Sequence, residues 1–485
     1  MKTSLPLCAL SLALLTALPA AADPALTIYN QNFAVVRDTL SLNLQTGVNQ
    51  VRYAGATAQL EPDSVILRDP AGGHTLQILE QNYRNDPVSE PMLLSLFEGK
   101  TIHFLNTRTK ASTEVDELIS GKVIRSGYVP GANPQEPIIE VDGKLRFSLP
   151  GKPMFPDLGD DTVLQPTLNW VLQTDQPGKF DAEIGYVTEG FEWSASYNLV
   201  SPENGDLVDL VGWVTIKNDS GKTFKDAHIK LMAGDVNKIE PPQPNLYARR
   251  AMPMAMMVGG GGAGPAVTEK AFDEFHLYSI ARPTTLHDQE TKQVEFVHAE
   301  HVVAPTLYVY DGATDFHFYG GMNFDQGFGA ENNNKKVIVQ REFVNDETNH
   351  LGLALPKGKV RFYRRDADGQ LEFVGENEIN HTPRKETIRL TTGDAFDLVG
   401  ERKQTNYHVD TSEKWADESF EIKLRNRKKE PVEIRVVERL YRGQNWNLTA
   451  KSDAFVKKDA NTIEFRVTVE PDVERLVTYS VHYTW

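Results

Sequence analysis

The densest group of side chains that could bind a metal is the segment His298-Ala299-Glu300-His301. On a helix, His298 and His301 would share one face and could bind zinc as a pair. The surrounding residues, Val294–Val303, instead follow the pattern of a β-strand, in which an odd spacing directs two side chains to opposite faces. The sequence therefore favours two histidines on a strand, with a metal site as the alternative.

A second possible metal site is Asp366-Ala367-Asp368-Gly369, which is similar to the opening of a calcium-binding loop. A complete loop needs further oxygen ligands and a glutamate about twelve residues from its start. Here the chain continues directly into an apolar, strand-like segment beginning at Leu371. Asp366 and Asp368 are therefore predicted to lie in a hairpin turn, and calcium binding is the alternative.

Two further segments have compositions that could serve a ligand. Asp157, Asp160 and Asp161 lie in one loop, and a glycosidase needs two carboxylates that face each other across a cleft. Residues 241–265 contain the methionine- and glycine-rich stretch Met252–Gly264, which could bind copper(I) or an apolar partner. Solvated loop acids and a flexible connection are the favoured interpretations of these two segments.

Most motifs that would identify an enzyme are missing from the sequence. It contains no Gly-x-Ser-x-Gly, no His-Glu-x-x-His and no phosphate-binding glycine loop. The catalytic residues are therefore unknown at this stage, and no cofactor is predicted.

The first 22 residues are typical of a secretory signal peptide. Lys2 precedes a short apolar run, and the segment ends in Ala20-Ala21-Ala22. The only cysteine, Cys8, lies within this segment, so the remainder can form no disulfide. We expect an exported protein, located in the periplasm, at the cell surface or outside the cell.

The overall charge restricts the possible partners. The 485 residues include 51 basic and 67 acidic side chains, for a formal net charge of −16. An acidic surface argues against nucleic acid as a partner. No later segment is long and apolar enough to form a transmembrane helix.

Short alternating segments separated by turn residues predict an all-β protein. One short helix is expected at Pro91–Phe97, and a proline-rich stretch near Pro150 suggests a domain boundary. We predict an N-terminal β domain over 23–150, a central β-sandwich over 151–395 and an immunoglobulin-like sandwich over 396–485.

Two segments of the sequence are weak echoes of each other. Gly212–Asn218 leads through a polar turn to Ala227–Leu231, and Phe420–Asn426 leads through another to Val432–Val436. The residues Asn218-Asp219-Ser220-Gly221 are predicted to form a hairpin-type turn. This shared pattern suggests two related sandwiches.

The C-terminal segment has an alternation of its own. Val477, Tyr479, Val481, Tyr483 and Trp485 occupy every second position, which is typical of the last strand of an outer-membrane β-barrel. The last strand of a sandwich alternates in the same way. Other predicted strands carry charges on both faces, which argues against a barrel. A barrel therefore remains an alternative to the sandwich.

Several stretches resemble the bacterial domain-of-unknown-function 4139 family, which includes proteins named mucoidy inhibitor A. They are Leu168–Trp170, Gly185–Thr188, Phe191–Tyr197, Val214–Gly221, Asp226-Ala227, Asp394–Asp397, Leu424–Asn426 and Tyr483–Trp485. The resemblance implies an exported, β-rich protein and supplies no reaction, ligand or catalytic residue. Its motifs are interpreted as mainly structural.

Together these observations favour a non-enzymatic envelope protein that binds a protein or glycan partner, or has a structural role. One alternative is a periplasmic carbohydrate-active or cell-wall hydrolase that uses paired carboxylates. The other is the outer-membrane β-barrel.

Overall fold

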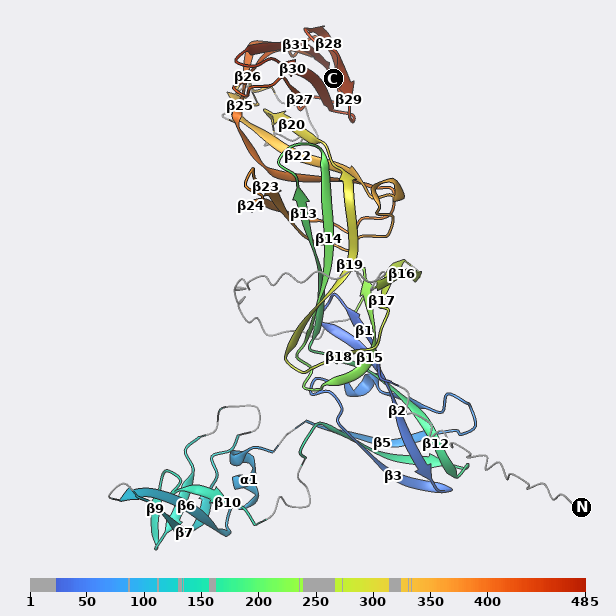
Figure 1. Ribbon diagram of the computed structural model, residues 1–485, viewed down its shortest axis with the longest axis vertical. Helices are drawn as coiled ribbons and strands as arrows, with labels where there is room; N and C mark the ends of the chain where they lie inside the picture. The colour runs from blue at the N-terminus through green and yellow to red at the C-terminus, as the bar shows by residue number, and fades with distance from the viewer. Residues whose placement is uncertain are drawn as a thin grey trace, which may run out of the picture. The chain divides into compact units, whose positions relative to one another are not determined.

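The computed structural model describes residues 23–85, 88–110, 113–129, 133, 135–156, 163–234, 236–238, 267–272, 274–313, 324–329, 331–332 and 334–485. The described chain consists almost entirely of strands, which confirms the predicted all-β class (Figure 1). The immunoglobulin-like topology stays a prediction. No described helix is long and apolar enough to cross a membrane.

The chain forms two compact units made of interleaved segments. Unit 1 comprises Met1–Glu192, Lys217–Lys230 and Arg282–Thr291, and unit 2 comprises Trp193–Ile216, Leu231–Ala281 and Lys292–Trp485. The strands that connect the segments belong in part to each unit.

Unit 1 contains three sheets. One has the order β15-β1-β2-β12-β4, and β18 also pairs with β15: β15 (Phe224–Ala233), β1 (Ala25–Tyr29), β2 (Phe33–Leu44), β12 (Gly178–Glu189), β4 (Ile66–Arg68) and β18 (Thr284–Leu286). The second has the order β3-β11-β5: β3 (Gly47–Ala54), β11 (Thr167–Thr174) and β5 (Gln77–Arg84).

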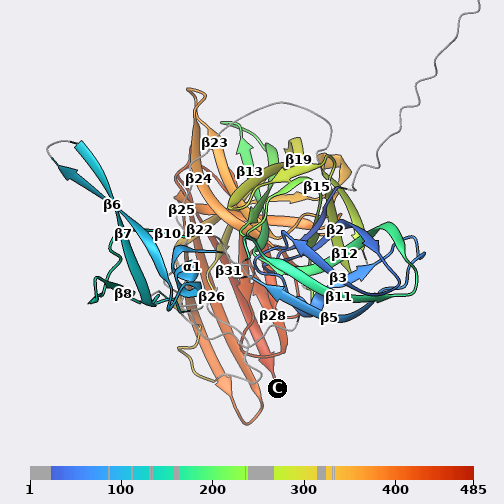
Figure 2. The same cartoon turned by 90° about the horizontal axis from the view of Figure 1, so that it is seen from below.

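The third sheet of unit 1 has the order β10-β6-β7-β8-β9, in which β6 and β7 form a long hairpin (Figure 2): β10 (Lys152–Met154), β6 (Thr101–Lys110), β7 (Thr113–Arg125), β8 (Ile138–Val141) and β9 (Lys144–Arg146). The helix α1 (Glu90–Leu96) confirms the helix predicted from the spacing of apolar residues. Its Ser89 side chain caps the N-terminus, and Leu94 packs with Phe104 and Val123 of the sheet. The unit also contains the 3₁₀ turn η1 (Pro62–Ser64).

Unit 2 contains a sheet with the order β19-β14-β13-β23-β24: β19 (Glu290–Val303), β14 (Leu207–Asn218), β13 (Phe191–Ser201), β23 (Gly358–Arg365) and β24 (Leu371–Ile379). Trp193, Tyr197 and Leu199 alternate along β13 and are buried. The Trp193 indole donates to the Met232 carbonyl at 3.1 Å, so its polar group remains paired. β16 (Val267–Phe272) pairs with β17 (Phe275–Ile280).

The largest sheet of unit 2 has the order β28-β31-β26-β25-β22-β20-β27-β30-β29, with β21 beside β25: β28 (Asn445–Lys451), β31 (Glu474–Thr484), β26 (Trp415–Asn426), β25 (Thr387–Asp410), β22 (Lys336–Val344), β20 (Thr306–Asp311), β27 (Val432–Arg439), β30 (Thr462–Val469), β29 (Phe455–Lys457) and β21 (Glu331–Asn332). The 3₁₀ turn η2 (Glu347–Asn349) follows β22. One apolar core combines residues from both ends of this order, including Phe420 and Tyr479 from one end and Val436 and Phe465 from the other. The alternating C-terminal residues from Val477 to Tyr483 are part of this core.

Fully buried asparagines close the strand ends of both units. Asn218 donates to the Lys222 carbonyl at 2.9 Å, and Asn426 donates to the Glu430 carbonyl at 2.8 Å. Each also accepts a backbone N–H two residues later, at 3.1 Å for Asn218 and 2.8 Å for Asn426. The echo in the sequence therefore corresponds to a shared turn that is held by one side chain.

The prediction that Asn218-Asp219-Ser220-Gly221 joins the two strands of a hairpin is wrong, because β14 and β15 belong to different sheets. The Asn218 amide also donates to the His287 carbonyl at 3.0 Å, which fixes the turn between sheets. Gly221 has a φ of 81°, and a Cβ atom there would lie 2.7 Å from the Cβ of Ala58. The turn therefore connects β14 of one sheet to β15 of another.

Candidate functional site

The predicted metal ligands do not form a cluster. His298 and His301 both lie on β19 and are exposed, because a positive φ of 59° at His301 interrupts the alternation of the strand. His298 Nδ1 lies 3.3 Å from Glu295 Oε1. Within the described ranges, no group of three or more His, Cys, Asp or Glu side chains is arranged to hold a metal.

Asp366 and Asp368 lie in the turn of the β23–β24 hairpin, as the first interpretation of the sequence predicted. The Asp366 side chain accepts the backbone N–H of Ala367 at 2.8 Å. The Asp368 side chain accepts two hydrogen bonds from Gln370, at 2.9 and 3.0 Å. Their oxygens are therefore used to shape the turn.

Asp157, Asp160, Asp161 and the stretch Met252–Gly264 lie outside the described residues. The structure provides two other groups of polar residues in unit 2. One is a set of buried ion pairs, and the other is an open cleft.

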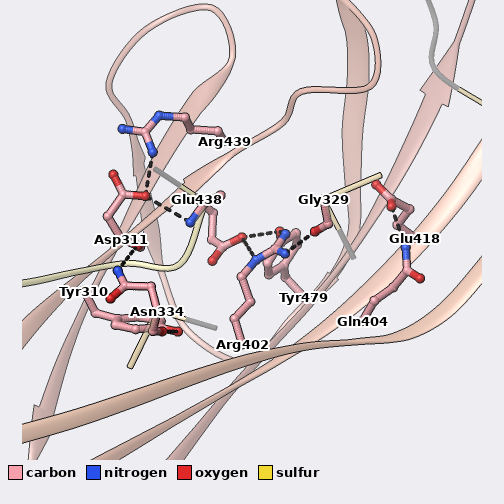
Figure 3. Close-up of polar contacts among 11 residues, drawn as sticks. Tyr310, Asp311, Gly329, Asn334, Arg402, Gln404, Glu418, Glu438, Arg439 and Tyr479 are labelled. Atoms are coloured by element: carbon pink, nitrogen blue, oxygen red, sulfur yellow. Dashed lines mark hydrogen bonds and ion pairs between the residues drawn. The ribbon is translucent and has the colours of Figure 1, made fainter. Parts of the chain in front are cut away.

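The first buried ion pair joins Arg402 of β25 to Glu438 of β27 (Figure 3). Both side chains are 0% exposed, and Arg402 Nε donates to Glu438 Oε2 at 2.8 Å. The same carboxylate oxygen accepts the Tyr479 hydroxyl at 2.6 Å, and Arg402 Nη1 donates to the Gly329 carbonyl at 2.6 Å. The guanidinium also stacks 3.9 Å from the ring centroid of Phe420.

The second buried ion pair joins Arg442 to Glu418 of β26, with Arg442 Nε 2.6 Å from Glu418 Oε1. Arg442 also donates to the carbonyls of Asp325 at 2.7 Å and Phe328 at 3.0 Å. Gln404 donates to Glu418 at 2.7 Å (Figure 3). Every charged group of the two pairs is thus enclosed by protein.

Burial changes the proton affinities of these groups. Burial raises the pKa of Glu418, and the charge of Arg442 opposes the shift. Burial alone would lower the pKa of Arg402, but the charge of Glu438 reverses the effect, and the pKa lies well above its usual range. We interpret both pairs as structural, because each buried charge lies against an opposite charge within the protein.

The sequence interpretation missed these pairs because it used the charges on both faces of the strands only as an argument against a barrel. The sequence did contain a signal for their burial, namely which face of the strand each charged residue shares with its apolar neighbours. Glu438 continues the buried series Ile434 and Val436, and Glu418 precedes the buried series Phe420 and Ile422. A charge at the same parity as a run of buried apolar residues must point into the core.

The open cleft is lined in part by β25 and β27, the two strands that carry the first ion pair. It has a volume of about 590 Å³. Its walls come from β13, β14, β20, β22, β23, β24, β25 and β27, together with residues 428–431. Because β25 and β27 carry Arg402 and Glu438, the buried ion pair fixes two of the strands that line the cleft.

The turn that begins at Asn426 positions one basic side chain of the cleft. Asn426 fixes the backbone at Lys428, and Lys428 Nζ donates to the Tyr308 hydroxyl at 2.9 Å. The ammonium also lies 4.9 Å from the centroid of the Tyr308 ring. Lys428 is thus held against an aromatic wall of the cleft.

Phe396 is the most unusual residue of the cleft, because it lines the cavity and is 98% exposed. Its neighbours Ala395 and Asp397 also line the cleft. The sequence interpretation grouped this segment with structural motifs. An aromatic side chain left in solvent has no role in the core and is available to a ligand.

A further polar cluster lies in unit 1. Lys222 Nζ is 3.3 Å from Asp38 Oδ2 and 3.2 Å from the Tyr53 hydroxyl, which donates to the same carboxylate oxygen at 3.1 Å. Burial lowers the pKa of Lys222, and Asp38 opposes the shift. Because each group has a partner in the cluster, we interpret it as a link between strands.

The cleft and both ion pairs lie within the range that a family comparison identifies. A model of DUF4139, a domain of unknown function, matches residues 182–485. No curated protein matches the chain. Because the match covers more than half of the 485 residues, as the resemblance of the sequence motifs suggested, the chain belongs to the DUF4139 family.

Proposed function

We propose that this chain is an exported envelope protein that binds a glycan in the cleft of unit 2, without catalysing a reaction on it. The observation that carries the proposal is Phe396, an exposed aromatic ring set among polar groups in a cavity. Sugars present apolar C–H faces that pack on aromatic rings, and hydroxyls that need both donors and acceptors.

The other lining residues supply both kinds of hydrogen-bonding group. Arg364 and Lys428 are donors, Asp206 and Asp397 are acceptors, and Thr392 can be either. Convergent polar groups around an exposed ring are typical of a binding site that orients a small ligand. A stable protein interface covers about 800 Å² on each partner, which is a larger surface than the cleft offers.

A glycan array tests the proposal. The full chain without residues 1–22 is applied to the array and compared with Phe396→Ala and with Phe147→Ala, which changes another exposed phenylalanine in unit 1. We expect binding that is lost in Phe396→Ala and retained in Phe147→Ala. No binding on the array, or equal binding by all three proteins, would reject the proposal.

Incubation with the bound glycan separates binding from hydrolysis. We expect the glycan to keep its length, as measured by mass spectrometry. A shortened product would favour the alternative of a carbohydrate-active hydrolase instead.

The proposed export depends on the segment Met1–Ala22. We expect cells that express the full chain to place it outside the cytoplasm, and cells that express residues 23–485 to retain it inside. Equal distribution of the two proteins in fractionated cells would contradict export by this segment.

A further inference from the structure

Three basic residues of the cleft donate hydrogen bonds to neutral groups. Arg341 Nη1 donates to the Ala304 carbonyl at 2.8 Å, and Arg364 Nη2 donates to the Glu203 carbonyl. Lys428, as described above, is bonded to a hydroxyl. Carbonyls and hydroxyls orient a cation without neutralising it, so these positive charges remain available to an anion.

Two carboxylates of the cleft form long ion pairs with its arginines and are largely hydrated. Asp206 lies 3.6 Å from Arg341, and Glu433 lies 3.9 Å from Arg435. Their side chains are 58% and 52% exposed, so water competes strongly for both. In contrast, the carboxylate of Glu438 is fully buried at 2.8 Å from its arginine.

Arg435 provides the most specific indication of a ligand. Its side chain is 17% exposed, and its Nε atom is buried without a hydrogen bond to any described residue. Glu433 Oε1 lies 3.9 Å from this atom, which is too far for a hydrogen bond, and a buried donor without a hydrogen bond is costly. Because Arg435 lines the cleft, an oxygen of a molecule bound there could accept this hydrogen bond.

From these contacts we propose that the glycan is acidic, and that Arg364, Arg435 and Lys428 bind its carboxylate groups. This inference rests on the proposed function. Planar guanidinium groups match carboxylates with two parallel hydrogen bonds. The ligand is a uronic-acid polymer with one carboxylate on each sugar.

The acidic residues of the cleft explain why a uronate fits better than a polyphosphate. Asp206, Asp397, Glu430 and Glu433 also line the cavity, and the whole chain has a net charge of −16. These groups repel a dense polyanion. They accept hydrogen bonds from the hydroxyls of a uronate, whose lower charge density the nearby arginines offset.

The test uses oligogalacturonate and its methyl ester, which share the same sugar backbone but differ in charge. Calorimetry measures binding to the full chain, to Arg364→Gln and to Arg435→Gln. Arg475→Gln is the matched control, because Arg475 pairs with Asp453 outside the cleft. We expect the acidic form to bind at least roughly 10-fold more tightly than the ester.

Each cleft variant should weaken binding of the acidic form by roughly 10-fold, and Arg475→Gln should not change it. Equal binding of the acid and the ester would overturn the inference and leave glycan binding in place. Binding of neither form would also overturn it, and the glycan array would then decide the proposed function separately. Equal affinities of the cleft variants and the control would exclude these arginines as the site.

Discussion

Unit 2 uses arginine in two contrasting ways. Arg402 and Arg442 are enclosed, and each lies less than 3 Å from a buried carboxylate. Arg364 and Arg435 lie in the cleft, where backbone carbonyls or hydrated acids are their neighbours. The difference teaches that the charges of Arg402 and Arg442 stabilise the fold. The charges of Arg364 and Arg435 remain available to bind a ligand.

The largest expected effect comes from breaking a buried pair. Arg402→Met leaves the carboxylate of Glu438 buried without its cation, and we expect the free energy of unfolding to fall by about 3–5 kcal/mol. Urea unfolding followed by tryptophan fluorescence measures the change.

The control for this prediction is the double variant Arg402→Met/Glu438→Gln. It removes both charges and keeps an acceptor for the Tyr479 hydroxyl, so it should lose less stability than Arg402→Met alone. If the double variant is less stable than the single variant, the buried carboxylate is not the source of the cost.

An intermediate effect is expected at Asn426, whose hydrogen bonds contribute both to the stability of unit 2 and to the position of Lys428 in the cleft. Asn426→Ala removes hydrogen bonds to the carbonyls of Glu430 and Val469 and should cost about 2 kcal/mol in the free energy of unfolding. It should also weaken glycan binding, because Lys428 is no longer held at the cleft.

Asn218→Ala is the matched control, since Asn218 makes equivalent hydrogen bonds in unit 1. Thermal unfolding and calorimetry should show a similar loss of stability for both variants. Only Asn426→Ala should bind the glycan less tightly. A binding defect of equal size in Asn218→Ala would show that the turn acts through general stability.

The smallest expected effect concerns an exposed ion pair. Hydrogen bonds from Arg425 and Lys335 lower the pKa of Glu401 from 4.5 to about 2. A lowered pKa means that the unfolded chain binds the proton more readily. The stabilisation is therefore complete above pH 4.5 and is lost as the pH falls toward about 2.

Glu401→Gln should be slightly less stable than the parent protein at pH 7, because the ion pair is exposed, and this difference should disappear as the pH falls toward about 2. Urea midpoints measured across the acid range test the prediction. Glu372→Gln, on the exposed hairpin strand β24, is the control and should follow the parent protein. If Glu401→Gln lost more free energy of unfolding at pH 7 than Arg402→Met, the exposed ion pair would contribute more stability than the buried one, and the prediction would be wrong.

Local features of the fold could be predicted from the sequence. The alternation from Val477 to Tyr483 predicted a strand that is β31, and the helix expected at Pro91–Phe97 is α1. The hairpin at Asp366 followed from its turn residues. These features depend on neighbours within a few positions, which is the distance over which a sequence pattern is informative.

The cleft could not be predicted, because its walls come from strands that are far apart in the sequence. Arg364 and Arg435 line the same cleft only because of the places that β23 and β27 occupy in their sheets. Register and strand order are tertiary properties with no signal of their own in one sequence. The burial of Glu438, in contrast, was readable from the parity of Ile434 and Val436.

The interleaving of the two units has a consequence for biosynthesis. β1 is the first strand of the described residues, yet it lies beside β15, and the Pro24 carbonyl accepts the His228 N–H at 2.9 Å. The last segment of unit 1 ends at Thr291. At a synthesis rate of roughly 5–20 residues per second, β1 emerges on the order of ten seconds or more before its partner. Unit 1 is therefore completed late in synthesis, and a chain that ends before Phe224 would leave β1 paired on one edge only, with β2.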